Sequence, residues 1–318
     1  QQQQQQGQQR QQEQGWGHTQ GGGAPFLTNE SVFNLTQLPR RLLVLGGGPI
    51  GVELAQAFQR LGSEVTVLCR GRGVLDKEDE EAALLVSQAL QREGVKVLPL
   101  CRVRLVEGVG TQGGVRVSLT YTPTHTQPPA SPAQPQPLSP SLSVSESQSQ
   151  SLSVSQSVSL SESQSESLVL EADCLLVAAG RRPTVRGMGL VSAGVAHSDA
   201  DGITVDDYMR TSNPLIYAAG DCCSRFQFTH AADSMARICI RNALFHGSAR
   251  FSQLVIPWCT FTSPEVAHVG LYPRDLVKRG VIFKTVRVEM RDVDRCRCDG
   301  GVEGDDVGEG VGDGACEG

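Results

Sequence analysis

Three glycines spaced as G-x-G-x-x-G could hold the phosphates of a dinucleotide. Gly46, Gly48 and Gly51 follow a continuous apolar run at residues 42–45. In this fingerprint the first glycine makes a tight turn, the second lets a pyrophosphate approach the backbone, and the third lets helix and strand pack closely. A glycine-rich turn without a ligand is the alternative. The residues that we predict to line the dinucleotide here are Gly46, Gly48, Pro49, Ile50, Gly51 and Glu53.

A strand and a helix must flank this turn to position it. The apolar run at 42–45 is typical of a strand that is buried on both faces. Apolar residues then recur at helical spacing, and Gly62 stands where the helix should end. The N-terminus of such a helix presents free N–H groups and a positive dipole end to phosphate. The apolar positions of this helix are Val52, Leu54, Ala55, Phe58 and Leu61.

Two arginines indicate which nicotinamide nucleotide is bound. The next predicted strand covers residues 64–69 and ends at Cys69, where an acidic residue would bind the ribose 2′-hydroxyl of NAD. Arg70 and Arg72 follow directly. Guanidinium groups bind phosphate oxygens in pairs, so these residues favour the 2′-phosphate of NADPH over NADH. The alternative is that both are ordinary solvated loop charges.

Residues 76–98 complete a second strand–helix–strand step. Residues 78–81 are all acidic and oppose the positive end of a helix, so we interpret them as structural. Gly94 can close that helix, and residues 95–98 predict the next strand. The apolar side of the helix is predicted to consist of Ala82, Leu84, Leu85, Ala89 and Leu90.

A second group of residues lies further along the chain. Gly180 and Arg181 follow an apolar strand, and Gly220 and Asp221 follow a predicted buried strand at 215–219. An aspartate in that position can accept a hydrogen bond from a hydroxyl of a bound dinucleotide. A helix is predicted from Phe228 to about His246, and its N-terminus could face the electron-rich edge of a flavin. The residues predicted for this second site are Gly180, Arg181, Gly220, Asp221, Thr229 and His230.

Four motifs in this order resemble the class I pyridine nucleotide-disulfide oxidoreductases. They lie at residues 46–53, 180–183, 217–221 and 261–270. Residues 256–265 and the arginine-rich loop are most similar to mercuric reductase-like proteins, followed by dihydrolipoyl dehydrogenase-like proteins and glutathione reductase. The resemblance covers about residues 25–122 and 168–291.

The resemblance implies an α/β fold, with a Rossmann-like NAD(P)-binding domain inserted in an FAD-binding domain and the start of an α+β dimerisation domain. It implies a homodimeric flavoprotein in which NAD(P)H passes hydride to FAD, and a cysteine pair then reduces a disulfide or Hg(II)-type acceptor. Glu53 would lie near the nicotinamide and flavin, and Asp221 would bind the ribityl chain of the flavin. A solvated carboxylate is the alternative for Glu53, and a surface or cap residue for His230.

The sequence departs from the family in its redox centre. The family's redox cysteines are separated by four residues, and none of the ten cysteines here has that spacing. The family's first flavin fingerprint and its catalytic His-Glu pair are also missing. We therefore expect a partial sequence that is inactive by itself. A non-catalytic NADPH-binding module and a relative of the flavin-dependent NAD(P)H dehydrogenases are the alternatives.

Composition divides the 318 residues into folded and low-complexity parts, with room for about two domains. A Ser/Gln/Pro-rich insert at 123–167 is predicted to be disordered, at the tip of a hairpin whose strands lie at 115–121 and near 168–170. The predicted domains are disordered 1–24, a flavin-domain remnant or linker at 25–40, the NAD(P) domain at 41–182, the C-terminal part of the FAD domain at 183–250, the start of the dimerisation domain at 251–291, and a disordered acidic tail at 292–318.

Charge and cysteine usage limit the partners. The net charge is −6 and basic residues are scattered, which argues against a nucleic-acid surface. No apolar run reaches the roughly 18 residues of a membrane span. The adjacent Cys222 and Cys223 are interpreted as packing residues, no metal site is expected, and a reducing compartment such as cytoplasm or an organelle interior would keep the thiols free. The chain begins without Met, so we expect that its true N-terminus lies upstream and a targeting peptide cannot be judged.

Overall fold

The computed structural model describes residues 26–109, 114–122, 166–294 and 298. It divides into two compact units, Gln1–Gly270 and Leu271–Gly318. The predicted disordered segment at 1–24, most of the insert and most of the acidic tail lie outside the described residues.

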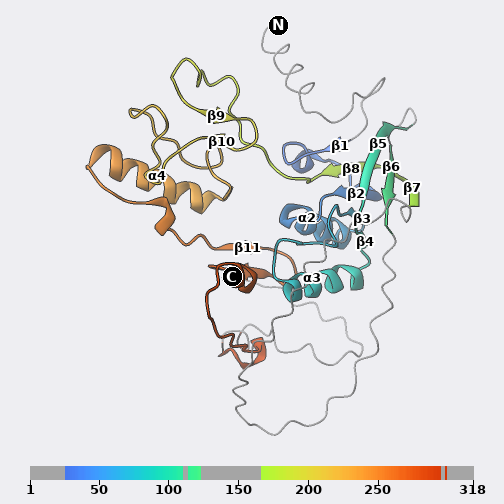
Figure 1. Cartoon of the computed structure of the whole chain (residues 1–318). Coiled ribbons are helices and arrows are strands. Elements are labelled where there is room, and N and C mark those ends of the chain that lie inside the picture. Colours follow the sequence, from blue (N-terminus) through green and yellow to red (C-terminus); the bar gives the residue numbers. More distant parts are fainter. Residues whose placement is uncertain (1–25, 110–113, 123–165, 295–297, 299–318) are drawn as a thin grey trace. The chain divides into compact units, whose positions relative to one another are not determined.

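The first unit contains a five-stranded parallel sheet (Figure 1). Its order is β1-β8-β2-β3-β4. The strands are β1 (Phe26–Leu27), β2 (Arg41–Leu45), β3 (Glu64–Leu68), β4 (Lys96–Leu98) and β8 (Cys174–Val177). Every neighbouring pair is parallel, so the predicted α/β class is confirmed. Part of the range 25–40 joins this sheet as the edge strand β1, and the assignment of that range to a flavin domain stays a prediction.

The central strand β2 is buried on both faces, as its continuous apolar run predicted. Leu42 and Val44 pack on one side with Val52 of α2 (Pro49–Arg60), whereas Leu43 packs on the other with a second, antiparallel sheet. Successive side chains of a strand point to opposite faces, so both faces need cover. One apolar run therefore serves two layers.

The helix α3 (Glu80–Arg92) covers the same face as α2, but its apolar stripe differs from the prediction. Val86, Ala89 and Leu90 are buried, whereas Leu84 and Leu85 are 55% and 52% exposed. At 3.6 residues per turn, Leu84 lies on the opposite side of the helix from Val86. The predicted apolar role of Leu84 and Leu85 is therefore wrong. Leu61, predicted to be apolar in α2, is also exposed, because it is the C-cap residue.

The second sheet is antiparallel, in the order β5-β6-β7. Its strands are β5 (Arg102–Gly108), β6 (Val115–Tyr121) and β7 (Glu166–Ala172). The predicted hairpin is confirmed, because β6 and β7 pair along their whole length with Tyr121 opposite Glu166. The hydroxyl of Tyr121 donates to Glu166 at 2.8 Å. The last two residues of the predicted insert, 166 and 167, therefore belong to a strand.

The residues after β8 form short strands, loops and one long helix. The strands β9 (His197–Ser198) and β10 (Gly202–Ile203) make a small hairpin, and α4 (Thr229–Leu244) agrees with the predicted helix. The predicted strand at 215–219 is wrong. Only Tyr217 pairs, in a single bridge with Arg210, and Leu215 is 90% exposed.

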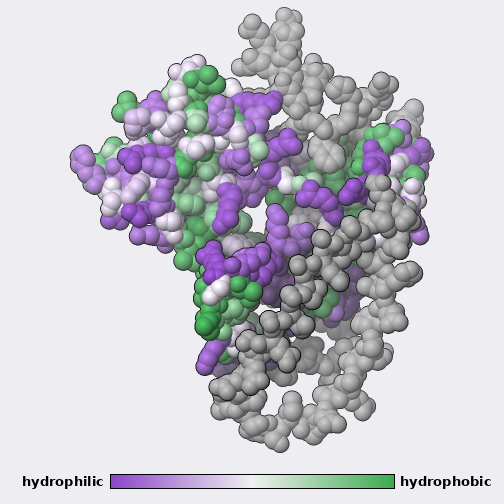
Figure 2. All heavy atoms as spheres, viewed as in Figure 1, coloured by the Kyte–Doolittle hydropathy of each residue, from purple (hydrophilic) through white to green (hydrophobic). Residues whose placement is uncertain are grey.

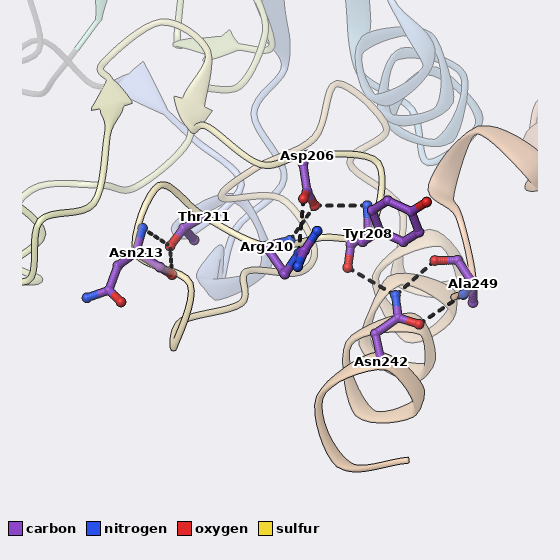
Figure 3. Close-up of polar contacts among 7 residues, drawn as sticks. All are labelled: Asp206, Tyr208, Arg210, Thr211, Asn213, Asn242 and Ala249. Carbon is purple, nitrogen blue, oxygen red and sulfur yellow. Dashed lines mark hydrogen bonds and ion pairs between the residues drawn. The ribbon is translucent and has the colours of Figure 1, made fainter. Parts of the chain in front are cut away.

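Side-chain hydrogen bonds explain why a turn replaces that strand (Figure 3). The hydroxyl of Thr211 donates to the carbonyl of Asn213 at 2.9 Å and accepts from its N–H at 3.2 Å, which closes a turn just before Leu215. Such local bonds compete with strand pairing.

Asn242 of α4 donates to the carbonyl oxygens of Tyr208 and Ala249 at 3.2 and 2.8 Å (Figure 3). It therefore links the loop at Tyr208 and the segment after α4 to the helix.

A hairpin of β11 (Trp258–Thr260) and β12 (Val266–His268) ends the first unit. The remaining short helices of the chain are η1 (Val32–Asn34), η3 (Phe251–Gln253), α5 (Pro273–Lys278) and η4 (Met290–Asp292). In the second unit, residues 281–290 expose many apolar side chains, and hydrophobic colour is visible on this part of the chain in Figure 2. Among the described residues, no helix combines the length and apolarity that crossing a bilayer would need.

Candidate dinucleotide-binding site

Two of the three fingerprint glycines are required by the packing of the protein itself. Gly46 has φ +116°, and a Cβ added there would lie 2.5 Å from the carbonyl oxygen of Ala178, directly after the neighbouring strand β8. A Cβ at Gly51 would overlap the carbonyl oxygen of Gly46. Helix α2 can therefore approach the sheet only because both positions lack side chains.

Gly48 is different, because no described residue lies close enough to require glycine there. Its backbone has φ −77° and ψ 178°, which any residue adopts, and an added Cβ would meet no atom of the described residues within 4 Å. Gly48 is also the N-cap of α2, with no side-chain cap and with proline in the first turn. The first N–H groups of a helix have no partners inside it. The turn thus offers open space beside backbone donors, which suits a diphosphate.

Gly47 was not among the predicted site residues, yet it is equally constrained. A Cβ at Gly47 would lie 2.6 Å from the Sγ atom of Cys69. Burial, followed by the nearby Cys101 and Asp76, raises the pKa of Cys69 to about 12, so its thiol is neutral and packs against the turn. Gly47 is the middle one of three consecutive glycines, and this run could have indicated that the middle position also lacks room for a side chain. Cys69 therefore stands at the predicted ribose position as a packing residue.

Arg70 and Arg72 lie on the loop after β3, and both are exposed. In the part of the chain that the structure describes, neither guanidinium forms an ion pair or a side-chain hydrogen bond. The loop backbone is fixed, because Leu100 donates to the carbonyl of Gly71 at 2.9 Å and Leu75 donates to that of Gly47 at 2.7 Å. The structure therefore holds both arginines on a loop bonded to the glycine turn.

Glu53 is half-buried on α2, and its carboxylate accepts the backbone N–H of Phe261 at 2.9 Å. The predicted position of Glu53 near a nicotinamide and a flavin stays a prediction. In this structure Glu53 holds the segment between β11 and β12 against α2.

Gln56, one turn further along α2, is a site residue that the sequence reasoning missed. It is 3% exposed, and its amide forms a reciprocal pair with Ser263: it donates to the carbonyl at 3.0 Å and accepts the N–H at 2.8 Å. It also donates to Glu93 at 2.8 Å. Gln56 stands next to the apolar positions Val52 and Ala55, and this placement could have indicated that it is buried. A buried amide requires hydrogen-bond partners.

The second group of predicted residues gathers near the start of α4. Arg181 donates to the carbonyl of Gln227 at 2.7 Å and lies 3.9 Å from the carboxylate of Asp221. Gly220 has φ +84°, and a Cβ there would lie 3.2 Å from that of Ala232. Gly180, at φ +120°, has open space around it. Asp221 is exposed, so its carboxylate is accessible to a ligand hydroxyl.

Thr229 and His230 form the first turn of α4, whose N-cap Phe228 provides no side-chain cap. The ring of His230 stacks on Phe228 with centroids 5.4 Å apart, and its Nε2 atom lies 2.7 Å from the carbonyl oxygen of Pro257. This ring therefore makes structural contacts, and its cofactor role stays a prediction. No group of three or more His, Cys, Asp or Glu residues among the described ones is arranged to hold a metal ion.

Comparisons with known proteins agree with the motifs. The family described as pyridine nucleotide-disulphide oxidoreductase matches residues 13–127 and 141–236. A mercuric reductase from Streptomyces lividans is 30% identical over 270 residues, which are 85% of this chain and 48% of that protein. A dihydrolipoyl dehydrogenase from Chlamydia muridarum is 27% identical over 267 residues, or 84% of this chain and 47% of that enzyme. The chain thus spans about half the length of these relatives.

A solved structure supports the fold. The HOCl-induced flavoprotein disulfide reductase RclA from Escherichia coli matches with a TM-score of 0.64 and 23% identity, over 89% of this chain and 56% of that one. The predicted Rossmann-like architecture and the predicted family resemblance are both confirmed.

Proposed function

Because the chain belongs to the pyridine nucleotide-disulphide oxidoreductase family, we propose that it binds NADPH at the glycine turn for hydride transfer to FAD. FAD and NAD(P) are the cofactors of this family, as the resemblance predicted. The observation that carries the proposal is the open space at Gly48, where the protein has room for a side chain and has none.

On the NADPH side, the backbone N–H groups of the N-cap Gly48 and of Ile50 and Gly51 in the first turn of α2 would hold the diphosphate, with Pro49 beside it. Proline contributes no N–H, and its fixed φ favours the helix start. Arg70 and Arg72 would bind the 2′-phosphate, since both are exposed and lack ion-pair partners among the described residues. A bidentate guanidinium–phosphate contact gives geometric selectivity as well as charge.

On the flavin side, Asp221 and the uncapped start of α4 would hold FAD. The carboxylate of Asp221 is accessible and can accept a ribityl hydroxyl, and Gly220 lets α4 approach closely. The positive end of α4 would stabilise negative charge on the reduced ring. When bound, FAD supplies the redox chemistry between the nicotinamide and a disulfide or Hg(II)-type acceptor.

The domain boundaries and assembly belong to the same proposal. Residues 41–182 would form the NAD(P) domain, 183–250 the C-terminal part of the FAD domain and 251–291 the start of a dimerisation domain. The residues matched in this chain make up about half of each relative. A homodimer and an electron acceptor are therefore proposed for a longer protein that contains this chain.

We further propose that these 318 residues do not by themselves reduce a disulfide. The ten cysteines include no pair separated by four residues, so the family's electron relay has no counterpart here. A thiolate pair is what carries electrons in thiol–disulfide exchange. The same observation favours a second candidate, a module that binds NADPH without catalysis.

Calorimetric titration of the purified chain with NADPH and NADH tests the nucleotide assignment. We expect tighter binding of NADPH, and in the double variant Arg70→Ala/Arg72→Ala a loss of about tenfold or more for NADPH alone. Arg104→Ala, which removes an exposed arginine on β5, is the matched control. Equal affinity for the two nucleotides in the unaltered chain contradicts the roles of Arg70 and Arg72.

The redox part is tested by visible absorbance and turnover. Addition of FAD should give a flavin spectrum if Asp221 and α4 suffice to hold it, and Asp221→Ala should weaken that binding. Reduction of a disulfide or of Hg(II) by NADPH with this chain alone would refute the proposed inactivity and exclude the non-catalytic module. Binding of NADPH without turnover is the expected result.

A further inference from the structure

Trp258 of β11 contacts Glu78, on the segment that follows the arginine loop, and Phe228, the N-cap of α4. We propose that Trp258 and Glu78 form a positioning pair, which holds the loop carrying Arg70 and Arg72 and thereby sets the preference for NADPH over NADH. This inference rests on the proposed NADPH site.

The first step is the contact between the pair. The indole Nε1–H of Trp258 donates to the Oε1 atom of Glu78 at 2.9 Å, across 180 positions of sequence. Glu78 is only 7% exposed. Burial of a carboxylate is costly unless it is hydrogen-bonded. The indole therefore helps keep Glu78 in place, whereas the sequence had placed Glu78 among the charges at the start of a helix.

The second step leads from Glu78 to the glycine turn. The backbone N–H of Glu78 donates to the carbonyl of Leu75 at 2.9 Å, and the N–H of Leu75 donates to the carbonyl of Gly47 at 2.7 Å. Leu75 is 2% exposed and has φ +51°, a conformation that a branched apolar residue keeps only when its surroundings hold it. A shift of Glu78 would therefore release Leu75 and the end of the arginine loop.

The third step is what fixes Trp258 itself. Its ring stacks on Phe228 with centroids 6.3 Å apart and planes within 9°, and lies 4.4 Å from the ring of His268. Phe228 is the N-cap of α4. The indole is thus anchored from outside the arginine loop, and it can serve as a fixed support for Glu78.

The consequence is selective for the 2′-phosphate. A paired guanidinium–phosphate contact depends on the orientation of both groups, so a small displacement of the loop weakens it. NADH has no 2′-phosphate and makes no such contact. Loss of the support should therefore weaken NADPH binding and spare NADH.

Calorimetric titration of the full chain with each nucleotide tests the pair. Trp258→Phe keeps an aromatic ring and removes the N–H donor. Trp16→Phe makes the same chemical change at the only other tryptophan and is the matched control. We expect Trp258→Phe to weaken NADPH about fivefold, at the low end of typical coupling between sites, and to leave NADH unchanged. Glu78→Met should behave in the same way, whereas Glu78→Gln retains an acceptor oxygen for the indole and should keep the preference.

The outcomes separate the inference from the function on which it rests. If the unaltered chain binds neither nucleotide, the proposed function is wrong and the role of the pair falls with it. If the unaltered chain prefers NADPH and both Trp258→Phe and Glu78→Met keep that preference, only the role of the pair is wrong. Equal weakening of NADPH and NADH also overturns it. Should Trp258→Phe fail to fold by circular dichroism, Glu78→Met decides, because it replaces a buried carboxylate with an apolar side chain of similar length.

Discussion

Alanine at Gly48 should leave stability nearly unchanged and alanine at Gly51 should lower it, although both residues belong to one fingerprint. The Cβ of Gly48→Ala would enter open space, and the backbone there is ordinary for alanine. Loss of chain entropy in the unfolded state favours this variant by about 0.4–1 kcal/mol. Alanine is a poorer N-cap than glycine, at a cost of roughly 0.5–1 kcal/mol. The two terms nearly cancel, so the free energy of unfolding should change by less than about 1 kcal/mol.

Gly51→Ala places its Cβ on the carbonyl oxygen of Gly46, which is backbone and cannot rotate away. Helix α2 must move off the sheet, and overpacking of this kind costs about 1–3 kcal/mol. The gain in helix propensity, about 1 kcal/mol, offsets only part of this cost. For a folded region of this size each kcal/mol corresponds to roughly 2–4 °C, so Gly51→Ala should lower the melting temperature by several degrees.

Thermal unfolding and nucleotide titration on the same two variants complete the test. Gly48→Ala should melt close to the unaltered chain but bind NADPH about tenfold more weakly or worse, because its methyl group occupies the approach of the diphosphate. If Gly48→Ala binds NADPH normally, the diphosphate does not lie over this turn. If Gly51→Ala is as stable as the unaltered chain, the packing argument for the third glycine is wrong.

Two further predictions concern stability. Gln56→Leu should lower the free energy of unfolding by about 0.5–1.5 kcal/mol in urea titration, because the hydrogen bonds that join α2 to the backbone of the exposed Ser263 are lost. The exposed Gln91→Leu is the control and should be nearly neutral. The hydrogen bond from Arg60, and then that from Gln56, lowers the pKa of Glu93 below its usual 4.5, so the stabilisation is fully present above that pH and is lost as the pH falls through the folded-state pKa. Glu93→Gln should therefore lose less stability than the unaltered chain on acidification, and parallel pH profiles for the two would contradict this assignment.

The sequence by itself determined the local parts of the site. The spacing of the fingerprint glycines, the apolar run of β2 and the apolar spacing of the helix behind it all lie within about twenty positions of each other. Apolar periodicity and the steric freedom of glycine act over such short ranges, so they are readable from the chain. The hairpin that flanks the insert was also predictable, because its two strands pair directly with each other along their whole length.

The contacts made by distant segments were decided by the tertiary structure alone. Trp258 meets Glu78 across 180 positions, and Gln56 meets Ser263 across 207. In the sequence Glu78 and Gln56 look like exposed polar residues, and only packing shows that both are buried and need a partner. The strand order β1-β8-β2-β3-β4 likewise inserts β8 between two strands that precede it by more than a hundred residues. The spacing of apolar residues shows which face of a helix or strand is buried, but it does not show which other helix or strand packs against that face.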